Sequence, residues 1–185
     1  MKNSSNTVIK IALVGPESTG KSDLAAALAL HYNSTWVKEY AREYLNNLKR
    51  DYEYADLVKI AKGQIELEEK AILIANENIA PLGARGLLFC DTNLTVIKIW
   101  SEFKFGKCDE WITKEIKNRP YDIHLLTDID LPWQDDPLRE NPNNRKELFE
   151  LYVSELKQQE VPLEIVSGLG DERVKNAIAI IEKLI

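Results

Sequence analysis

The chain has 185 residues, of which 44% are hydrophobic and 8% aromatic, and its formal net charge is −6 at pH 7. This length and composition fit one globular domain with a single hydrophobic core. The acidic balance disfavours a nucleic-acid partner, because such a partner requires clustered Lys and Arg to neutralise its phosphates. The two cysteines are too few and too far apart in the sequence for a disulfide framework or a metal knuckle.

Export and membrane insertion are also disfavoured by the sequence. Residues 1–6 are polar with one Lys and lack the apolar core of a signal peptide. No apolar run approaches the ~18 residues of a membrane span. We therefore expect a cytoplasmic protein with no membrane partner. The sequence leaves the oligomeric state open, and a homo-oligomer is compatible with it.

Apolar runs alternate with helical patterns in the first half of the chain. Runs rich in branched residues predict buried strands of a parallel sheet, whereas apolar residues three and four apart predict helices. In chain order, the predicted elements are a strand at 8–14, a helix from 23 to 32, a strand at 35–37, a helix within 39–47 and a long helix at 56–77. Pro81 and Gly83 then break the helical pattern.

The second half continues this alternation. In chain order, the predicted elements are a strand at 87–90, a helix at 94–103 capped by Asn93 or Asp91, a helix at 109–117, a strand at 121–126, a helix at 145–157, a strand at 163–166 and a closing helix that is capped by Asp171 and ends at Leu184. Residues 131–144 are rich in Pro, Asp and Asn and have no apolar period. We interpret this stretch, the lid segment, as a functional or mobile loop.

The alternation of five strands with helices predicts the fold class. We expect an α/β protein, a three-layer α/β/α sandwich in which helices cover both faces of a five-stranded parallel sheet. We expect one domain over residues 1–185, with the lid at about 131–144.

Residues 15–22, the glycine loop, read Gly-Pro-Glu-Ser-Thr-Gly-Lys-Ser and match the phosphate-binding pattern G-x-x-x-x-G-K-[ST] in full. The loop lies between a predicted strand and a predicted helix, as that pattern requires. Backbone N–H groups of such a loop surround a phosphate, and the N-terminus of the following helix favours anions. We therefore predict a P-loop NTPase fold that binds ATP. The residues expected to contact the nucleotide are Gly15, Glu17, Ser18, Thr19, Gly20, Lys21 and Ser22.

Three residues beside the nucleotide have distinct expected tasks. Lys21 would reach the β and γ phosphates and act in catalysis, and the Ser22 hydroxyl would ligate Mg²⁺. Asp91 follows a predicted strand, where a carboxylate can supply the second contact to the magnesium site and act in catalysis. Its alternative role is to cap the next helix, and the two roles are compatible.

Glu39 and Arg42 follow the second predicted strand, so we expect them to lie at the same edge of the sheet as the glycine loop. A kinase needs a carboxylate to orient or deprotonate the acceptor hydroxyl, and Glu39 is a candidate for this catalytic role. The alternative for Glu39 is an ordinary charge in the first turn of a helix. Arg42 would clamp a phosphate or pair with Glu39.

Aromatic and arginine side chains in and near the lid segment are further candidates. Trp133 lies in a polar loop, where an indole either packs or stacks on a flat ring. Trp100 lies on an apolar helical face and is either a core residue or part of an acceptor pocket. Arg139 and Arg145 would neutralise charge during phosphoryl transfer, or each is a surface charge.

Beyond these individual residues, the chain resembles the ribosylnicotinamide kinase domain of the NadR-type family, among the P-loop kinases and AAA-like ATPases. The resemblance covers nearly the whole chain. It rests on the glycine loop, on the sequence Glu-Tyr-Ala-Arg-Glu-Tyr at 39–44, on Asp91 with Thr92, and on residues 96–106 and 121–141. The glycine loop is shared by many unrelated NTPases, whereas the last two segments are narrower signals.

The resemblance implies transfer of the γ-phosphate of ATP to the 5′-hydroxyl of nicotinamide riboside, which gives nicotinamide mononucleotide for NAD salvage. It implies that Trp100 or Trp133 faces the acceptor ring and that Glu39 contacts the ribose or its reacting hydroxyl. The expected substrate-binding set is Glu39, Tyr40, Arg42, Asp91, Trp100 and Trp133.

Longer members of the family also carry a DNA-binding module and an adenylyltransferase domain. Because the kinase unit begins almost at Met1 here, we expect neither activity. Small changes in a pocket can redirect a kinase, so a kinase of another nucleoside or small hydroxyl compound is an alternative. An alternative of another class is a nucleotide-dependent switch that binds a protein partner.

Overall fold

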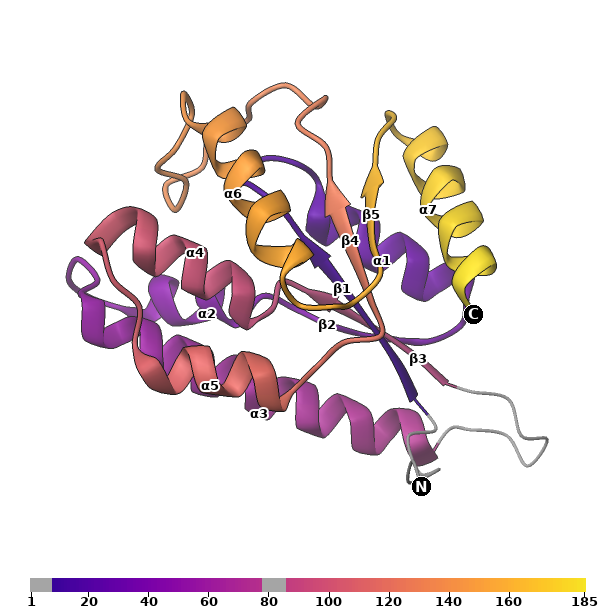
Figure 1. Ribbon diagram of the computed structural model, residues 1–185, viewed down its shortest axis with the longest axis horizontal. Coiled ribbons are helices and arrows are strands. Elements are labelled where there is room, and N and C mark those ends of the chain that lie inside the picture. Colours follow the sequence, from indigo (N-terminus) through magenta and orange to yellow (C-terminus); the bar gives the residue numbers. More distant parts are fainter. Residues whose placement is uncertain (1–7, 78–85) are drawn as a thin grey trace.

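A parallel five-stranded sheet lies at the centre of the structure, a computed structural model that describes residues 8–77 and 86–185 (Figure 1). In spatial order, the strands are β2 (Thr35–Val37), β3 (Gly86–Asp91), β1 (Val8–Val14), β4 (Ile123–Thr127) and β5 (Leu163–Val166). The register places Leu13 of β1 between Asp91 of β3 and Leu125 of β4. The carboxyl ends of the three central strands therefore meet at one edge of the sheet.

Helices cover both faces of the sheet (Figure 1). The described ranges contain α1 (Lys21–His31), α2 (Tyr40–Asn47), α3 (Tyr54–Glu77), α4 (Leu94–Phe105), α5 (Glu110–Asn118), α6 (Arg145–Lys157) and α7 (Asp171–Leu184). One face packs against α1 and α7, and the other packs against α3, α4 and α6. The chain leaves β1 into α1 on one face and leaves the neighbouring β3 into α4 on the other. Such a reversal opens a ligand-binding crevice at the carboxyl ends of the strands.

The alternation of side chains along β1 explains why its sequence is apolar apart from Lys10. Ile11 and Leu13 point toward α1 and α7, whereas Ala12 and Val14 point toward α4 and α6. All four residues are fully buried. A strand that is covered on both faces has no solvent side, so its sequence lacks the polar alternation of an exposed sheet.

The structure confirms the predicted three-layer fold and most of the predicted elements. Strands β1, β2 and β5 and helix α6 have the predicted bounds, and Asn93 caps α4 by accepting a hydrogen bond from the N–H of Val96 at 3.2 Å. The helix break predicted at Pro81 and Gly83 lies outside the described residues, as do residues 1–6. No helix in the described ranges has the length and apolar character needed to cross a membrane.

Bounds of the other elements differ from the predictions by one or two residues. Two of the differences have identifiable physical reasons. Strand β4 begins at Ile123 instead of Tyr121, because the side-chain carboxylate of Asp122 accepts the N–H of Lys10 at 2.8 Å in place of a backbone carbonyl. Asp171 does not cap α7. The N-cap is Gly170, whose φ of 52° is a left-handed conformation that glycine adopts without strain, and Asp171 is the first residue of the helix.

Candidate nucleotide and acceptor site

The glycine loop joins the carboxyl end of β1 to the N-terminus of α1. Ser18 and Gly20 take left-handed conformations, with φ of 57° and 73°, and such residues within a turn form concave arrays of N–H groups that bind anions. Gly20 is the N-cap of α1 and supplies no side-chain cap, so the first N–H groups of the helix remain available to a ligand. At Gly15, an added Cβ would lie 2.7 Å from Thr127 Oγ1, so a larger residue does not fit there.

Short polar side chains fix the loop to the sheet. Thr19 Oγ1 donates to the carbonyl of Pro16 at 2.8 Å and lies 2.7 Å from Thr127 Oγ1. Thr127 Oγ1 in turn lies 3.1 Å from the carbonyl of Val14, which it can reach as a donor. Both threonines are fully buried. These contacts hold the loop against the ends of β1 and β4, so its shape is set before a ligand arrives.

Lys21 lies inside the glycine loop. Its Nζ donates to the carbonyls of Gly15 and Pro16 at 2.9 and 2.8 Å. Burial lowers the pKa of Lys21, and the nearby carboxylates of Glu39 and Asp91 oppose that effect. The ammonium is therefore held by neutral oxygens beside two acids, where phosphate oxygens could replace the carbonyls as acceptors.

Two acidic residues lie beside this lysine. Asp91, which is 2% exposed, is the last residue of β3. Burial raises the pKa of Asp91, and it also raises the pKa of Glu39, the N-cap residue of α2. In both cases Lys21 lowers the pKa in opposition. Desolvated carboxyl groups of this kind are common where a site moves a proton or holds a cation.

A cavity of about 1140 Å³ extends from the glycine loop to an aromatic wall. One end is formed by residues 15–23 together with Glu39. The other end is formed by the α2–α3 loop, α4 and α6. Its lining side chains include Leu45, Arg50, Tyr52, Val96, Trp100, Phe103, Lys104, Leu148 and Tyr152. The cavity is large enough for two substrates, because sites for single small molecules commonly measure roughly 300–1,000 Å³.

The lid segment lies over the glycine loop and is bonded to it. The carboxylate of Glu17 accepts the backbone N–H groups of Glu140, at 3.1 Å, and Asn141, at 2.9 Å. Ser18 Oγ accepts the N–H of Gln134 at 2.8 Å. The loop that is positioned to bind phosphate is therefore also an anchor for the lid segment.

A protein-family model described as an AAA domain matches residues 10–173. The chain belongs to this AAA domain family. A curated relative of this AAA domain is the trifunctional NAD biosynthesis/regulator protein NadR of Escherichia coli (strain K12). The two are 29% identical over 157 residues, which make up 82% of this chain and 36% of the relative. The chain thus spans about a third of the length of the curated relatives that it matches.

Solved structures share the fold of this AAA domain. A crystal structure of NadR protein in complex with NR has a TM-score of 0.78 and 23% sequence identity, over 96% of this chain and 52% of that one. Deoxyadenosine kinase from M. mycoides, solved with products bound, has a TM-score of 0.61 and 14% identity, over 95% of this chain and all of that one. These likenesses establish a P-loop kinase-like α/β fold.

Most of the side chains predicted for the site lie together around the cavity. The lining contains all seven glycine-loop residues predicted to contact nucleotide and also Glu39, Arg42, Trp100 and Arg139. Arg42 is bonded to Asp136 of the lid segment at 2.9 Å, and it does not form the predicted pair with Glu39. Arg139 donates to Ser18 Oγ at 3.4 Å and to the carbonyl of Gln134, so it joins the lid segment to the glycine loop.

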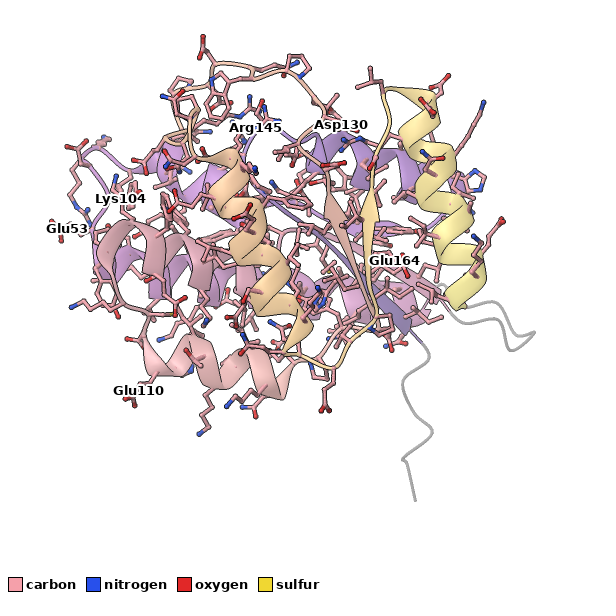
Figure 2. The ribbon with its side chains drawn as sticks, turned by 45° about the horizontal axis from the view of Figure 1, so that its top comes forward. Glu53, Lys104, Glu110, Asp130, Arg145 and Glu164 are labelled. Carbon is pink, nitrogen blue, oxygen red and sulfur yellow. The ribbon has the colours of Figure 1, made fainter. Side chains whose placement is uncertain are left out.

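Four of the predicted residues lie outside the cavity lining: Asp91, which is buried at the end of β3, and Tyr40, Trp133 and Arg145. The ring of Tyr40 packs against Gly63 of α3, where an added Cβ would come within 2.0 Å of it. Trp133 donates its indole N–H to Asp135 within the lid segment, at 2.8 Å. Arg145, at the start of α6, donates to the carbonyls of two residues after β4, near Asp130 (Figure 2). Tyr40, Trp133 and Arg145 thus each contact a partner elsewhere in the fold.

Sequence reasoning missed a group of side chains at the end of the cavity away from the glycine loop, which is the candidate acceptor end. Tyr52 accepts the indole N–H of Trp100 at 2.9 Å and donates to Glu140 of the lid segment at 2.6 Å. Lys104 pairs with the same glutamate at 2.8 Å. These residues come from three segments that are far apart in the sequence. No local spacing pattern marks them, so only the folded arrangement identifies the group.

Proposed function

We propose that this AAA domain is an ATP-dependent kinase that phosphorylates the 5′-hydroxyl of nicotinamide riboside to give nicotinamide mononucleotide. The observation that carries the proposal is the single cavity, which joins a phosphate-binding loop to an aromatic wall. The name of the NadR relative, an NAD biosynthesis protein, supports this acceptor, as does the separate structure of a NadR protein in complex with NR. The kinase names among the fold neighbours support phosphoryl transfer.

The glycine loop would bind the triphosphate of ATP. Its N–H groups and the first turn of α1 supply donors for the phosphate oxygens. Lys21 would exchange its two carbonyl acceptors for β- and γ-phosphate oxygens. The ammonium then moves little on binding, so little of the binding free energy is lost to reorganisation.

Ser22 and Asp91 fit a magnesium ion. Burial raises the pKa of Asp91 and the nearby Ser22 hydroxyl lowers it, so the two groups lie close together beside the loop. Oxygen atoms such as theirs are the ligands that Mg²⁺ prefers. No group of three His, Cys, Asp or Glu side chains in the described ranges could hold a metal alone. Oxygens of the bound nucleotide would therefore complete the coordination. The ion would supply neutralisation of phosphate charge.

Glu39 would orient the acceptor hydroxyl and accept its proton. It lines the end of the cavity formed by the glycine loop, and it is electrostatically coupled to Lys21 and Asp91. Burial raises the pKa of Glu39, which makes its carboxylate a stronger base than one in water. Trp100 and Tyr52 would offer aromatic surfaces to the nicotinamide ring, because both line the far wall.

The lid segment would exclude water from the reacting phosphate. Arg139 is the lid arginine that lines the cavity, so we assign to it the stabilisation of charge on the transferring phosphoryl group. Arg145 would instead hold the base of the lid segment through its two carbonyl contacts. This division of roles follows from the position of each guanidinium.

The test is direct phosphorylation. Purified protein is incubated with MgATP and nicotinamide riboside, and nicotinamide mononucleotide is quantified by chromatography and mass spectrometry. The Lys21→Ala variant, prepared in parallel, controls for contaminating kinases, and chelation of magnesium should stop the reaction. We expect product formation and ADP release in equal amounts, both dependent on the acceptor.

An acceptor panel separates the proposal from its two alternatives. Deoxyadenosine, other nucleosides and small sugars are compared with nicotinamide riboside by kcat/KM. A preference of more than tenfold for another acceptor would keep the kinase but reject nicotinamide riboside. A nucleotide-dependent switch would be supported by two results together: slow ATP hydrolysis that no acceptor accelerates, and stoichiometric binding of a protein partner.

A further inference from the structure

Arg173 is a buried charged side chain to which sequence analysis assigned no role. It lies in the first turn of α7 and is 4% exposed. It is the one buried arginine in the described ranges, residues 8–77 and 86–185. Burial of a guanidinium is costly unless its donors are bonded and its charge is compensated. The partners of Arg173 therefore show what this burial achieves.

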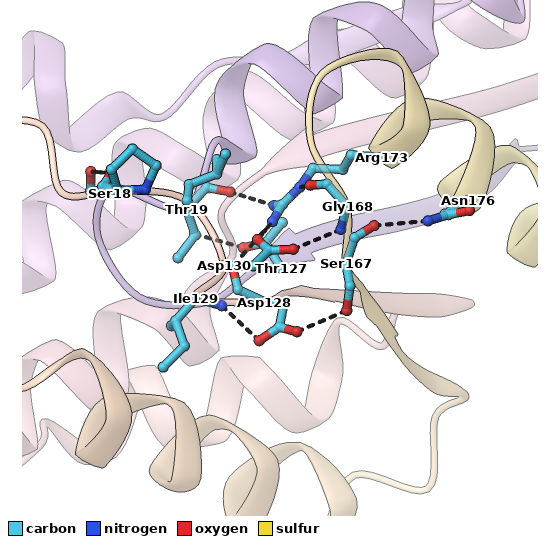
Figure 3. A network of polar contacts seen from close by, with 12 residues as sticks. Ser18, Thr19, Thr127, Asp128, Ile129, Asp130, Ser167, Gly168, Arg173 and Asn176 are labelled. Atoms are coloured by element: carbon cyan, nitrogen blue, oxygen red, sulfur yellow. Dashed lines mark hydrogen bonds and ion pairs between the residues drawn. The ribbon is translucent and has the colours of Figure 1, made fainter.

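The guanidinium of Arg173 joins three segments that are far apart in the sequence (Figure 3). Nε donates to the carbonyl of Gly168 at 2.8 Å, in the turn between β5 and α7. Nη2 contacts the carboxylate of Asp130 and the carbonyl of Asp128, after β4. Nη1 donates to the carbonyl of Thr19 in the glycine loop at 2.6 Å.

The contact with Thr19 bears directly on phosphate binding. In a trans peptide the C=O and the following N–H point in opposite directions. Because Nη1 of Arg173 holds the carbonyl of Thr19 on the α7 side, the N–H of Gly20 is turned away from α7. Gly20 has a left-handed φ of 73° and lines the cavity, so this peptide orientation presents its N–H to a ligand in the glycine loop.

The same guanidinium also fixes the base of the lid segment. Arg173 holds Asp128 and Asp130 from the α7 side, while Arg145 donates to the carbonyls of Ile129 and Leu131 from α6. Residues 128–131 are thus held between two arginines, and one of these arginines also reaches the glycine loop. Movement of the lid base would have to disturb the contact that orients the Thr19–Gly20 peptide.

We propose that Arg173 is a positioning residue for polyphosphate binding, which fixes the Thr19–Gly20 peptide with its N–H directed into the glycine loop and couples it to the base of the lid segment. The inference rests on the proposed function only in requiring that the loop binds a polyphosphate. Arg173 does not line the cavity and acts through the peptide that it holds. Its loss should therefore affect the phosphates and leave acceptor binding unchanged.

The experiment compares Arg173→Met with Arg173→Lys in the full chain. Dissociation constants for MgATP and for inorganic tripolyphosphate, which lacks a base and a ribose, are measured by calorimetry. We expect about a tenfold loss of affinity for both ligands in Arg173→Met, the effect of one hydrogen bond to a charged group. Arg173→Lys keeps the charge but can bond fewer segments at once. We therefore expect its affinity for both ligands to fall by about threefold. The KM for the acceptor should not change.

Asn176→Ala is the matched control. Asn176 lies one turn further along α7 and donates to the carbonyl of Ser167 at 3.0 Å, so it also ties α7 to the turn after β5. Within residues 8–77 and 86–185, Asn176 makes no hydrogen bond to the glycine loop. Its substitution should leave the dissociation constants for MgATP and tripolyphosphate within twofold of wild type. An equal loss in Asn176→Ala would overturn the inference, because the effect would then come from the docking of α7.

The outcomes separate this inference from the proposed function. If wild-type protein binds neither MgATP nor tripolyphosphate, the nucleotide site itself is wrong and both ideas fail. If wild type binds both ligands and folded Arg173→Met binds them equally well, only the role of Arg173 is rejected. Should Arg173→Met fail to fold, Arg173→Lys decides. A tripolyphosphate affinity within 1.5-fold of wild type in that variant would also overturn the inference.

Discussion

The two ends of the cavity are built in different ways. The nucleotide end is one continuous run of residues at the edge of the sheet, and its expected donors are mostly backbone N–H groups. The acceptor end is assembled from the α2–α3 loop, α4, α6 and the lid segment. Its contacts join side chains to side chains, such as Tyr52 to Trp100 and to Glu140.

This difference has a consequence for specificity. Backbone donors recognise any phosphate chain, so the nucleotide end can be similar in kinases with unrelated acceptors. The acceptor end can change with a few side-chain substitutions, because none of its contacts depends on a fixed loop sequence. Substitutions at the two ends should therefore have separable kinetic effects.

The largest expected effect is at the nucleotide end. Lys21→Ala removes the ammonium that lies inside the glycine loop and should lower kcat/KM by roughly a thousandfold or more, since it acts on charge that develops in the transition state. Binding of the acceptor alone, measured by calorimetry, should stay within twofold of wild type. A variant that kept a tenth of the wild-type turnover would remove Lys21 from the proposed mechanism.

A smaller effect is expected at Glu39, which lines the cavity beside the glycine loop. Glu39→Gln keeps the size of the side chain but removes the base, so kcat should fall by about a hundredfold. The affinity for MgATP should change little, because Glu39 donates nothing to the phosphates. Steady-state kinetics with calorimetry would test this separation. An unchanged kcat would show that Glu39 does not accept the proton.

The sheet that supports both ends provides a pH test. His124 is fully buried in β4, and burial lowers its pKa to about 4. Its unfolded-state pKa is about 6.5, so the unfolded chain binds the proton more readily. The titration of His124 therefore leaves the free energy of unfolding unchanged above pH 6.5. As pH falls from 6.5 toward 4, it lowers the free energy of unfolding by roughly 3 kcal/mol in total.

Denaturant unfolding between pH 7.5 and pH 4.5 would measure this loss. His124→Gln should flatten the pH profile, since its amide does not titrate. A profile that is equally steep without His124 would assign the pH dependence to other groups. Both ends of the cavity should lose ligand affinity together as the sheet unfolds, unlike the separable effects above.

The fold and the nucleotide end could be predicted because their signals are local. The apolar runs specify buried strands, and the spacing of Gly15, Gly20 and Lys21 specifies one loop geometry. The acceptor end could not be predicted in the same way. Tyr52 and Lys104 meet only through the packing of the α2–α3 loop against α4, and Arg173 reaches Thr19 from the other end of the chain.

The aromatic candidates illustrate the same limit. Trp100 and Trp133 were both candidates for the acceptor ring, because sequence alone does not say which way an indole points. The structure places Trp100 in the cavity wall and bonds Trp133 to Asp135 within the lid segment. Tyr40 belongs to a sequence segment that resembles the family, yet its ring packs against α3 because Gly63 leaves room for it.

The smallest expected effect concerns a residue that shapes the acceptor end without lining it. Asp56 is fully buried at the start of α3. Its carboxylate accepts two hydrogen bonds from Arg50, at 2.7 and 2.9 Å, and the N–H of Glu53 at 2.9 Å. These partners flank Tyr52, so Asp56 holds the loop that carries this tyrosine into the cavity. The bond to Arg50 is also the main reason why the pKa of Asp56 lies below its usual range.

Asp56→Asn should therefore loosen the wall around Tyr52 and raise the KM for the acceptor by about fivefold, while kcat and the KM for ATP stay near wild type. Lys59→Ala is the matched control, because Lys59 bonds the same carboxylate at 3.0 Å from the exposed side of α3 and does not belong to the loop. An equal rise in both variants, or a rise in the KM for ATP, would mean that Asp56 supports the whole domain. A rise confined to the acceptor would show that the second end of the cavity is positioned by its own buried anchor, independently of the glycine loop.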